Sequence, residues 1–166
     1  MRSRSSFLDV IAKTLVDREE TLAVAESVTA GHLQAAFSLA RKATEFYHGG
    51  ITVYNTAQKT RHLHIDPIAG ERTNCVSENI SASMARGVAR LFSSNWGIAI
   101  TGYAAPVPEW NVKNTLFAWY SIALNGNVLI SKKIEIRKMA MDSVQKFYAR
   151  TVLRDFAKYL STSRYS

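Results

Sequence analysis

The chain has 166 residues, of which 47% are apolar and 20% charged, a composition typical of a globular domain that can bury its own core. The formal charge of +8 permits a nucleic-acid partner, yet most basic residues of the C-terminal fifth fall on the polar side of a predicted helix or strand, as on a solvated face. The single cysteine, Cys75, excludes an internal disulfide and a cysteine-based zinc site. No stretch predicts a signal peptide or membrane span, so we expect a cytoplasmic protein without a membrane partner.

The first elements predict a strand followed by a helix. After a helix from Phe7 to about Val16, the apolar run Thr21–Ala25 predicts a strand that is covered on both faces. This run stops at Glu26-Ser27, and a helical pattern follows from Thr29 to about Leu39. The turn between them is therefore expected at the carboxyl end of the strand, where open α/β sheets bind ligands.

A second strand and two helices are predicted in the middle of the chain. Gly49-Gly50 leads into the β-branched and aromatic segment Ile51–Tyr54, and Asn55 or Thr56 can cap a short helix that carries Lys59. Pro67 and Gly70 mark a loop region. Ser77 is the expected N-cap of a long amphipathic helix, with Ile80, Met84, Val88 and Leu91 on one side.

The C-terminal part predicts three strands and a helix. Trp96–Thr101 reads as a buried strand that ends at Gly102, and Asn125-Gly126 joins two further strands as a hairpin. The last helix runs from about Met141 to Leu160 and is expected to bury Val144, Phe147, Tyr148, Val152, Phe156 and Tyr159. The whole pattern predicts an α/β fold, a single three-layer α/β/α domain over 1–166 whose mixed sheet includes one antiparallel hairpin.

Polar residues gather where three of these strands end, at Glu26–Thr29, at Tyr54–Lys59 and at Thr101–Pro106. Neighbouring strands would bring these ends together. A lysine with a depressed pKa can take the proton of a serine hydroxyl, and backbone N–H groups after Ser27 can hold an oxyanion or a phosphate. Taken singly, each residue has an ordinary structural explanation, such as a helix cap or a surface lysine. The four histidines show no metal-site spacing, so neither a metal nor another cofactor is predicted.

Several segments resemble, in order, the CinA C-terminal domain family. Ala25-Glu26-Ser27-Val28-Thr29-Ala30-Gly31 is similar to the family's Ala-Glu-Ser-Cys-Thr-Gly-Gly, and Val53–Lys59 to its Val-x-Tyr-Ser-Asn-Glu-Ala-Lys, with the same step from Tyr to Lys. Val76-Ser77-Glu78 resembles its Val-Ser-Glu helix start, and Ala99–Pro106 its Thr-Gly-Ile-Ala-Gly-Pro strand end. The similarity runs from about residue 20 to 125.

The resemblance implies a metal-independent amidohydrolase that converts nicotinamide mononucleotide and water to nicotinic acid mononucleotide and ammonia. Carried over, Ser27 would be the nucleophile, Lys59 its base and Tyr54 an aide in positioning or proton transfer. The residues expected to bind the substrate are Glu26, Thr29, Ala30, Gly31, Asn55, Thr101, Gly102 and Arg137. A homo-oligomer is also implied.

The surroundings of this trio depart from the family. Val28 stands in place of cysteine, Ala30 and Ala105 in place of glycines, and Tyr103 in place of a small aliphatic residue, while the loop 103–114 has lost its glycines. An added methyl at Ala30 is expected to obstruct a close approach of ligand to backbone. The alternative hypothesis is thus an impaired family member that binds a nucleotide or a protein partner. A nucleic-acid module built on the basic C-terminal helix is the least favoured hypothesis.

Overall fold

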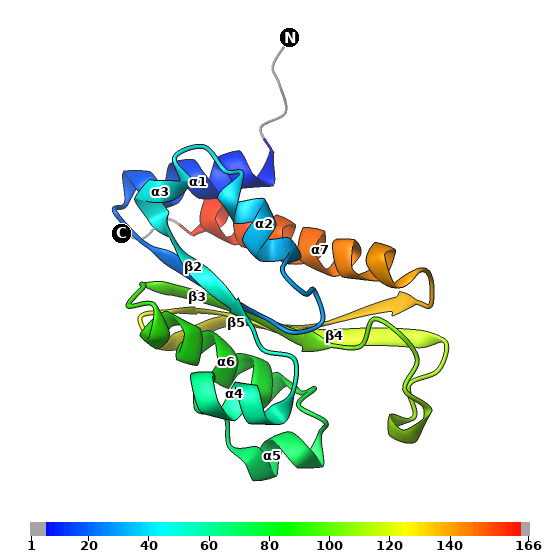
Figure 1. Ribbon diagram of the computed structural model, residues 1–166. Helices are drawn as coiled ribbons and strands as arrows, with labels where there is room; N and C mark the ends of the chain where they lie inside the picture. The colour runs from blue at the N-terminus through cyan, green and yellow to red at the C-terminus, as the bar shows by residue number, and fades with distance from the viewer. Residues whose placement is uncertain (1–5, 164–166) are drawn as a thin grey trace.

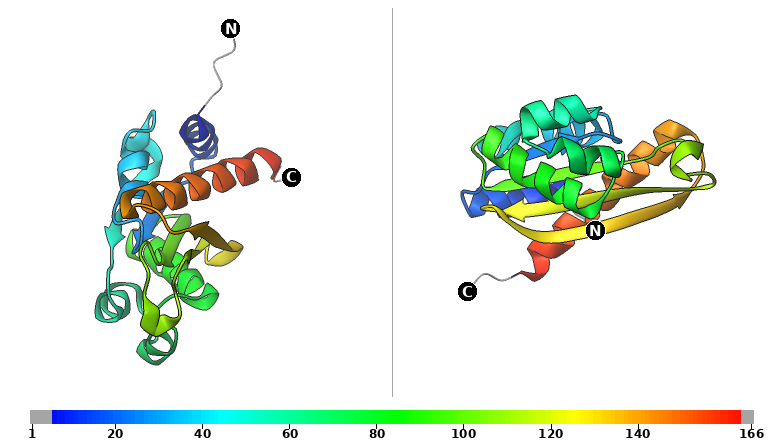
Figure 2. Two further views of the ribbon diagram at one scale, coloured as in Figure 1. Left: turned by 90° about the vertical axis from the view of Figure 1, so that its right-hand side faces the viewer. Right: turned by 90° about the horizontal axis from the view of Figure 1, so that it is seen from below.

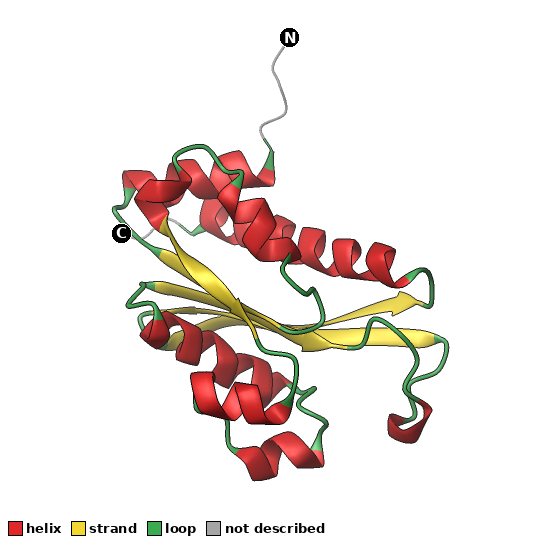
Figure 3. Ribbon diagram, in the orientation of Figure 1, coloured by secondary structure: helices red, strands yellow, loops and turns green. Residues whose placement is uncertain are grey.

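The structure is a computed structural model that describes residues 6–163, and it has three layers with a sheet in the middle (Figures 1 and 3). The strands follow the order β2-β1-β3-β4-β5 across the sheet. Their bounds are β1 Leu22–Glu26, β2 Tyr47–Thr52, β3 Trp96–Gly102, β4 Thr115–Leu124 and β5 Asn127–Arg137. β1 pairs in parallel with both β2 and β3, whereas β4 runs antiparallel to β3 and β5. The predicted mixed sheet with its β4–β5 hairpin is therefore confirmed.

Helices cover both faces of the sheet (Figures 1 and 2). One face carries α1 Phe7–Asp17, α2 His32–Ser38, α3 Ala43–Phe46 and α7 Met141–Thr162. The other carries α4 Thr56–Leu63, α5 Pro67–Arg72 and α6 Glu78–Leu91. A short 3-10 helix, η1 Pro108–Trp110, lies in the loop between β3 and β4. Among the described residues, no helix has the length and apolar character needed to cross a membrane.

The fully buried strand β1 separates two apolar clusters. Leu22 and Val24 belong to the cluster under α1 and α7, while Ala23 and Ala25 belong to the cluster under α4 and α6. Successive strand residues point to opposite faces, so a nearly unbroken apolar run is what a strand between two helical layers requires. The turn that follows β1 therefore begins at a strand that is packed against helices on both faces of the sheet.

Three boundaries differ from the sequence predictions. α2 begins at His32 rather than Thr29, because Ala30 and Gly31 both have left-handed backbone (φ 49° and 104°) and interrupt any helix there. The glycine pair lies inside β2 and Tyr54 lies beyond it. Glycine is required at position 50, because a Cβ there would come within 2.8 Å of the Val24 carbonyl oxygen. The predicted loop around Pro67 is α5, which Asp66 caps by accepting from the Ile68 N–H.

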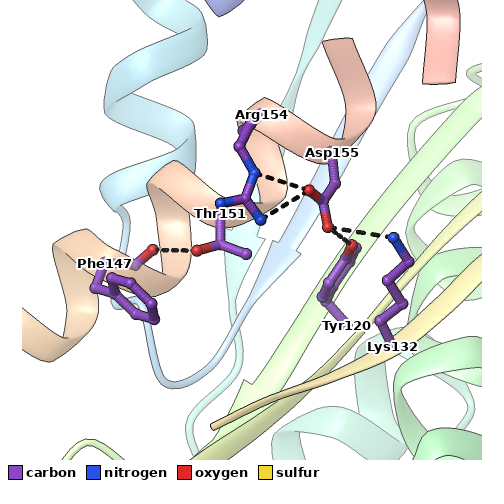
Figure 4. Close-up of polar contacts among 6 residues, drawn as sticks. All are labelled: Tyr120, Lys132, Phe147, Thr151, Arg154 and Asp155. Atoms are coloured by element: carbon purple, nitrogen blue, oxygen red, sulfur yellow. Dashed lines mark hydrogen bonds and ion pairs between the residues drawn. The ribbon is translucent and has the colours of Figure 1, made fainter. Parts of the chain in front are cut away.

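Helix α7 is anchored to the sheet by a polar network on Asp155 (Figure 4). The hydroxyl of Tyr120, a fully buried residue of β4, donates to Asp155 Oδ2 at 2.6 Å. Lys132 Nζ lies 3.5 Å from the same oxygen, and Arg154 Nε donates to Oδ1 at 3.0 Å. On this helix the prediction for Phe147 was wrong: its side chain is exposed, as is that of Leu91 on α6, while Tyr148 and Phe156 are buried.

Candidate active site

A cavity of about 230 Å³ opens at the carboxyl end of the parallel strands. It brings together residues from all three predicted clusters, namely Ser27, Val28, Tyr54, Lys59, Thr101, Gly102 and Tyr103. Asn74, Val76 and Met141 also line it. The position agrees with the general rule that α/β sheets bind ligands beyond the carboxyl ends of their strands.

The central contact of the cavity joins Ser27 and Lys59. Ser27 follows β1 directly, and its backbone N–H donates to the Ile100 carbonyl of β3 at 3.1 Å, which fixes the residue to the sheet. Lys59 lies in α4, and its Nζ donates to Ser27 Oγ at 3.1 Å. Both side chains are buried, and Lys59 is only 2% exposed. The nucleophile and the base that the sequence suggests are therefore within hydrogen-bonding distance.

Lys59 lacks a counter-ion: within residues 6–163 it forms no ion pair. Burial disfavours its charged form and lowers its pKa below the usual lysine value, although the nearby Cys75 acts weakly in the opposite direction. A lysine in this state loses its proton more easily and becomes a competent base. Asn55, which was predicted to bind substrate, does not line the cavity; its side chain instead caps α4, the helix of Lys59, by accepting from the Gln58 N–H.

Glu26 fills the N-terminal end of α2. It is fully buried, and its carboxylate accepts from the N–H groups of Leu33 (2.8 Å) and Gln34 (3.0 Å), from Gln34 Nε2 (3.0 Å) and from Thr29 Oγ1 (2.6 Å). These helix N–H groups are therefore not available to a phosphate or an oxyanion. Glu26 and Thr29 do not line the cavity and instead brace the turn that carries Ser27.

The N–H groups nearest the nucleophile remain available. Val28 and Thr29 lie outside helices and strands, and neither backbone N–H has a hydrogen-bond partner in the part of the chain that the structure describes. Val28 directly follows Ser27 and lines the cavity, whereas Thr29 is fully buried and does not line it. The residue after the nucleophile is the position from which a backbone donor stabilises an oxyanion in many acyl-transfer enzymes. We therefore assign the candidate oxyanion donor to the Val28 N–H rather than to the start of α2.

Of the other predicted site residues, some line the cavity and others do not. Ala30 and Gly31 do not line the cavity. Ala30 is exposed, so the expectation that its methyl group obstructs the cavity was wrong. Arg137 is exposed near the end of β5 and is likewise absent from the lining. Thr101 lines the cavity while its Oγ1 donates to the Cys75 carbonyl at 2.7 Å. Tyr54 lies at the mouth, 67% exposed.

Asn74 and Tyr103 were not predicted to bind substrate, although both line the cavity. Tyr103 differs from the family residue at its position, and Asn74 belongs to none of the three polar clusters at the strand ends. One signal was available: Asn tolerates left-handed backbone, and an Asn before a helix N-cap often marks a tight turn. Asn74 and Cys75 indeed have φ values of 49° and 57°.

A larger hollow of about 510 Å³ lies beside α1, lined by residues that include Asp9, Lys13, Asp17, Arg41 and Lys42. Lys13 and Asp17 pair with each other across one helical turn, and Asp9 is engaged in the capping box of α1. This hollow contains neither a serine nor a buried base. Among the described residues no cluster of metal-ligating side chains occurs either. The smaller cavity is thus the stronger candidate on chemical grounds.

The fold and the cavity define an α/β domain that carries a buried serine–lysine pair at the carboxyl edge of its sheet. The CinA C-terminal domain family matches residues 4–160, and the chain belongs to this family. A CinA-like protein of Thermosynechococcus vestitus is 32% identical over 153 residues, which cover 92% of this chain and 34% of that protein. One of Picosynechococcus is 38% identical over 104 residues, 63% of this chain and 25% of that protein. The chain thus spans about a third or less of these relatives.

Solved structures of the superfamily share the fold. The competence-damaged protein (CinA) superfamily protein of Klebsiella pneumoniae superposes with a TM-score of 0.82 at 23% identity, covering 95% of this chain and 97% of that one. The competence or damage-inducible protein of Enterobacter asburiae gives 0.79 at 25% identity, with 93% and 96% covered. The three-layer architecture is therefore that of the superfamily.

Proposed function

We propose that the chain is a metal-independent amidohydrolase that hydrolyses nicotinamide mononucleotide to nicotinic acid mononucleotide and ammonia. The observation that carries the proposal is the 3.1 Å contact between Ser27 Oγ and Lys59 Nζ in a cavity where Lys59 has a lowered pKa and no counter-ion among the described residues. Family membership supports it, since deamidases of this substrate occur in the family that the sequence resembles.

In the proposed first half-reaction, neutral Lys59 accepts the Ser27 hydroxyl proton while Oγ bonds to the carboxamide carbon. The carbonyl oxygen takes the negative charge and accepts from the N–H group of Val28, which lines the cavity. When the intermediate collapses, the C–N bond breaks and the Lys59 ammonium gives its proton to the departing nitrogen, which leaves as ammonia. The product is an ester between Ser27 and the pyridine carboxyl.

In the second half-reaction, Lys59 takes a proton from water and the resulting hydroxide equivalent attacks the ester carbon. Collapse of this intermediate breaks the bond to Oγ, and the Lys59 proton returns to Ser27. The acid product then leaves through the mouth of the cavity. Tyr54, at this mouth, is proposed to position the substrate rather than to transfer protons, because it is largely exposed.

The direct test is ammonia release from nicotinamide mononucleotide by the wild type, Ser27→Ala and Lys59→Met. Ser27→Ala is expected to lower kcat by at least about a thousandfold, as loss of a nucleophile does in serine hydrolases. Asp66→Ala, which removes only the cap of α5, is the matched control and should keep wild-type kcat. Wild-type activity that survives both active-site substitutions would refute the proposal.

The alternative, a family member that binds a nucleotide or a protein partner without turnover, is favoured by one observation. Val28, Tyr103 and Ala105, which depart from the family, all line the cavity beside Ser27. Saturable binding of nicotinamide mononucleotide in calorimetry, with no ammonia released on prolonged incubation, would support this alternative. The predicted homo-oligomer is part of neither proposal and stays a prediction that sedimentation can check.

A further inference from the structure

Asn74 and Tyr103 form a polar pair on the wall of the cavity. Asn74 Nδ2 donates to the Tyr103 hydroxyl oxygen at 3.3 Å, and both residues line the cavity that contains Ser27 and Lys59. They come from separate parts of the chain, the turn before α6 and the residue after β3. Neither residue takes part in the proposed proton transfers.

Tyr103 is held rigidly in place. Its N–H donates to the Phe117 carbonyl at 2.9 Å, its own carbonyl accepts from the Tyr148 hydroxyl at 2.9 Å, and its ring meets the Phe117 ring edge-on at 5.3 Å. Only 7% of the residue is exposed. A side chain fixed at backbone and ring loses little entropy when it binds a ligand, which is the property of a pre-organised contact.

The pair leaves one donor and one acceptor unused. Within the described residues the Tyr103 O–H donates to no protein group, and Asn74 Oδ1 accepts from none. Burial raises the pKa of the Tyr103 hydroxyl, so it keeps its proton and stays a donor at neutral pH. The wall therefore offers a hydrogen-bond donor beside an acceptor, which is complementary to a ligand group that can both accept and donate.

We propose that Asn74 and Tyr103 form a subsite that binds the sugar hydroxyls of a nucleotide substrate. This inference rests on the proposed function, in which the carboxamide lies at Ser27 and its oxygen at the Val28 N–H group. Of the remaining parts of such a substrate, the ribose cis-diol carries adjacent groups that each accept and donate. The subsite makes Asn74 and Tyr103 specificity-determining residues that the enzyme uses for binding rather than for chemistry.

The test compares Tyr103→Phe and Asn74→Gly with the wild type in ammonia release from nicotinamide mononucleotide. Tyr103→Phe keeps the ring and its contact with Phe117, and Asn74→Gly suits the left-handed backbone at that position. Each change should raise KM about three- to tenfold, the effect of losing a net hydrogen bond, with kcat within about twofold. Tyr120→Phe, which removes a buried hydroxyl bonded to Asp155 on another part of the sheet, is the matched control and should leave KM unchanged.

A second measurement separates this subsite from the reaction itself. In the Ser27→Ala background, calorimetry should show the same three- to tenfold weakening of nicotinamide mononucleotide by either substitution, and no weakening for its 2′,3′-dideoxy analogue. Unchanged KM and Kd in both variants, or equal weakening for the dideoxy analogue, would overturn the subsite while leaving the proposed function intact. If the wild type releases no ammonia, the proposed function fails, and the calorimetric comparison alone decides the subsite: absence of binding overturns it.

Discussion

The polar network around Asp155 and the buried pair of Lys59 and Ser27 have opposite effects on the charge of their central side chain. Asp155, on α7, has cationic neighbours in Lys132 and Arg154 and a hydrogen bond from Tyr120 (Figure 4). Lys59, on α4, is more deeply buried, yet the only hydrogen bond of its side chain in the described structure goes to the neutral hydroxyl of Ser27.

The pKa shifts record this difference. Burial by itself would raise the pKa of Asp155, but the hydrogen bonds from Tyr120 and Arg154 and the charge of Lys132 outweigh it, so its pKa lies below the ordinary value. For Lys59, burial dominates and the pKa falls, which favours the neutral amine. The first network stabilises a charge that holds helix and sheet together. The second destabilises a charge, and such an arrangement is expected where a base is needed.

The largest expected effect comes from Lys59→Met, which replaces the buried amine with an apolar chain of similar length. Ammonia release should fall by at least about a thousandfold. Unfolding in urea at pH 7 should show the variant to be more stable by roughly 1–4 kcal/mol, because a buried charge without a partner costs free energy. This gain should shrink as the pH rises toward 10.5, since neutral Lys59 no longer carries that cost. Loss of both activity and stability would show that Lys59 is structural.

The matched change in the other network is Asp155→Asn, which keeps an acceptor for Tyr120 but removes the charge. It should lower the free energy of unfolding by about 1–3 kcal/mol at pH 7 and leave kcat within about twofold. Because the pKa of Asp155 is lowered in the folded state, its contribution is fully present above its unfolded-state pKa and is lost as pH falls through the folded one. In urea titrations the two proteins should therefore differ at neutral pH and converge in stability at strongly acidic pH, and a difference that does not change with pH would contradict this account.

The smallest predicted effect concerns the turn between β1 and α2, where Ala30 has a left-handed backbone (φ 49°). Ala30→Gly should raise the free energy of unfolding by up to about 1 kcal/mol, because glycine adopts this conformation without steric cost. Ala35→Gly, at an exposed position inside α2, is the control and should lower it by about 1 kcal/mol. Thermal unfolding measures both; a destabilised Ala30→Gly would mean that the methyl group makes an unrecognised contact.

The parts of the fold that local pattern dictates were predictable. The apolar segment that became β1, the Asn125-Gly126 hairpin and the amphipathic α6 each follow from periodicity or turn chemistry. Pro67 and Gly70 were read as a loop because both residues commonly break helices, yet Pro at the first turn of α5 is favourable there. The place of the glycine pair within β2 was predicted wrongly. The need for glycine at position 50 comes from Val24 on the neighbouring strand, which no local sequence pattern reveals.

The candidate site shows the same division. The position of Ser27, Tyr54, Lys59 and Thr101 around one cavity was foreseeable, because these residues lie at or beyond the carboxyl ends of strands that pair in one sheet. The saturation of Glu26 by α2 and the contact between Asn74 and Tyr103 depend on how a turn folds back in three dimensions. Arg137, which the family resemblance suggested as a substrate-binding residue, is exposed and does not line the cavity.

The most direct test of the central claim is an NMR titration of Lys59 in the protein with ¹³C-labelled lysine side chains, assigned by comparison with Lys59→Met. The account predicts a titration midpoint below the ordinary lysine pKa of 10.5. Ser27→Ala should retain this low midpoint, since burial rather than the serine is its main cause. A Lys59 midpoint at or above 10.5 in the folded protein would contradict the claim that this cavity holds a lysine ready to act as a base.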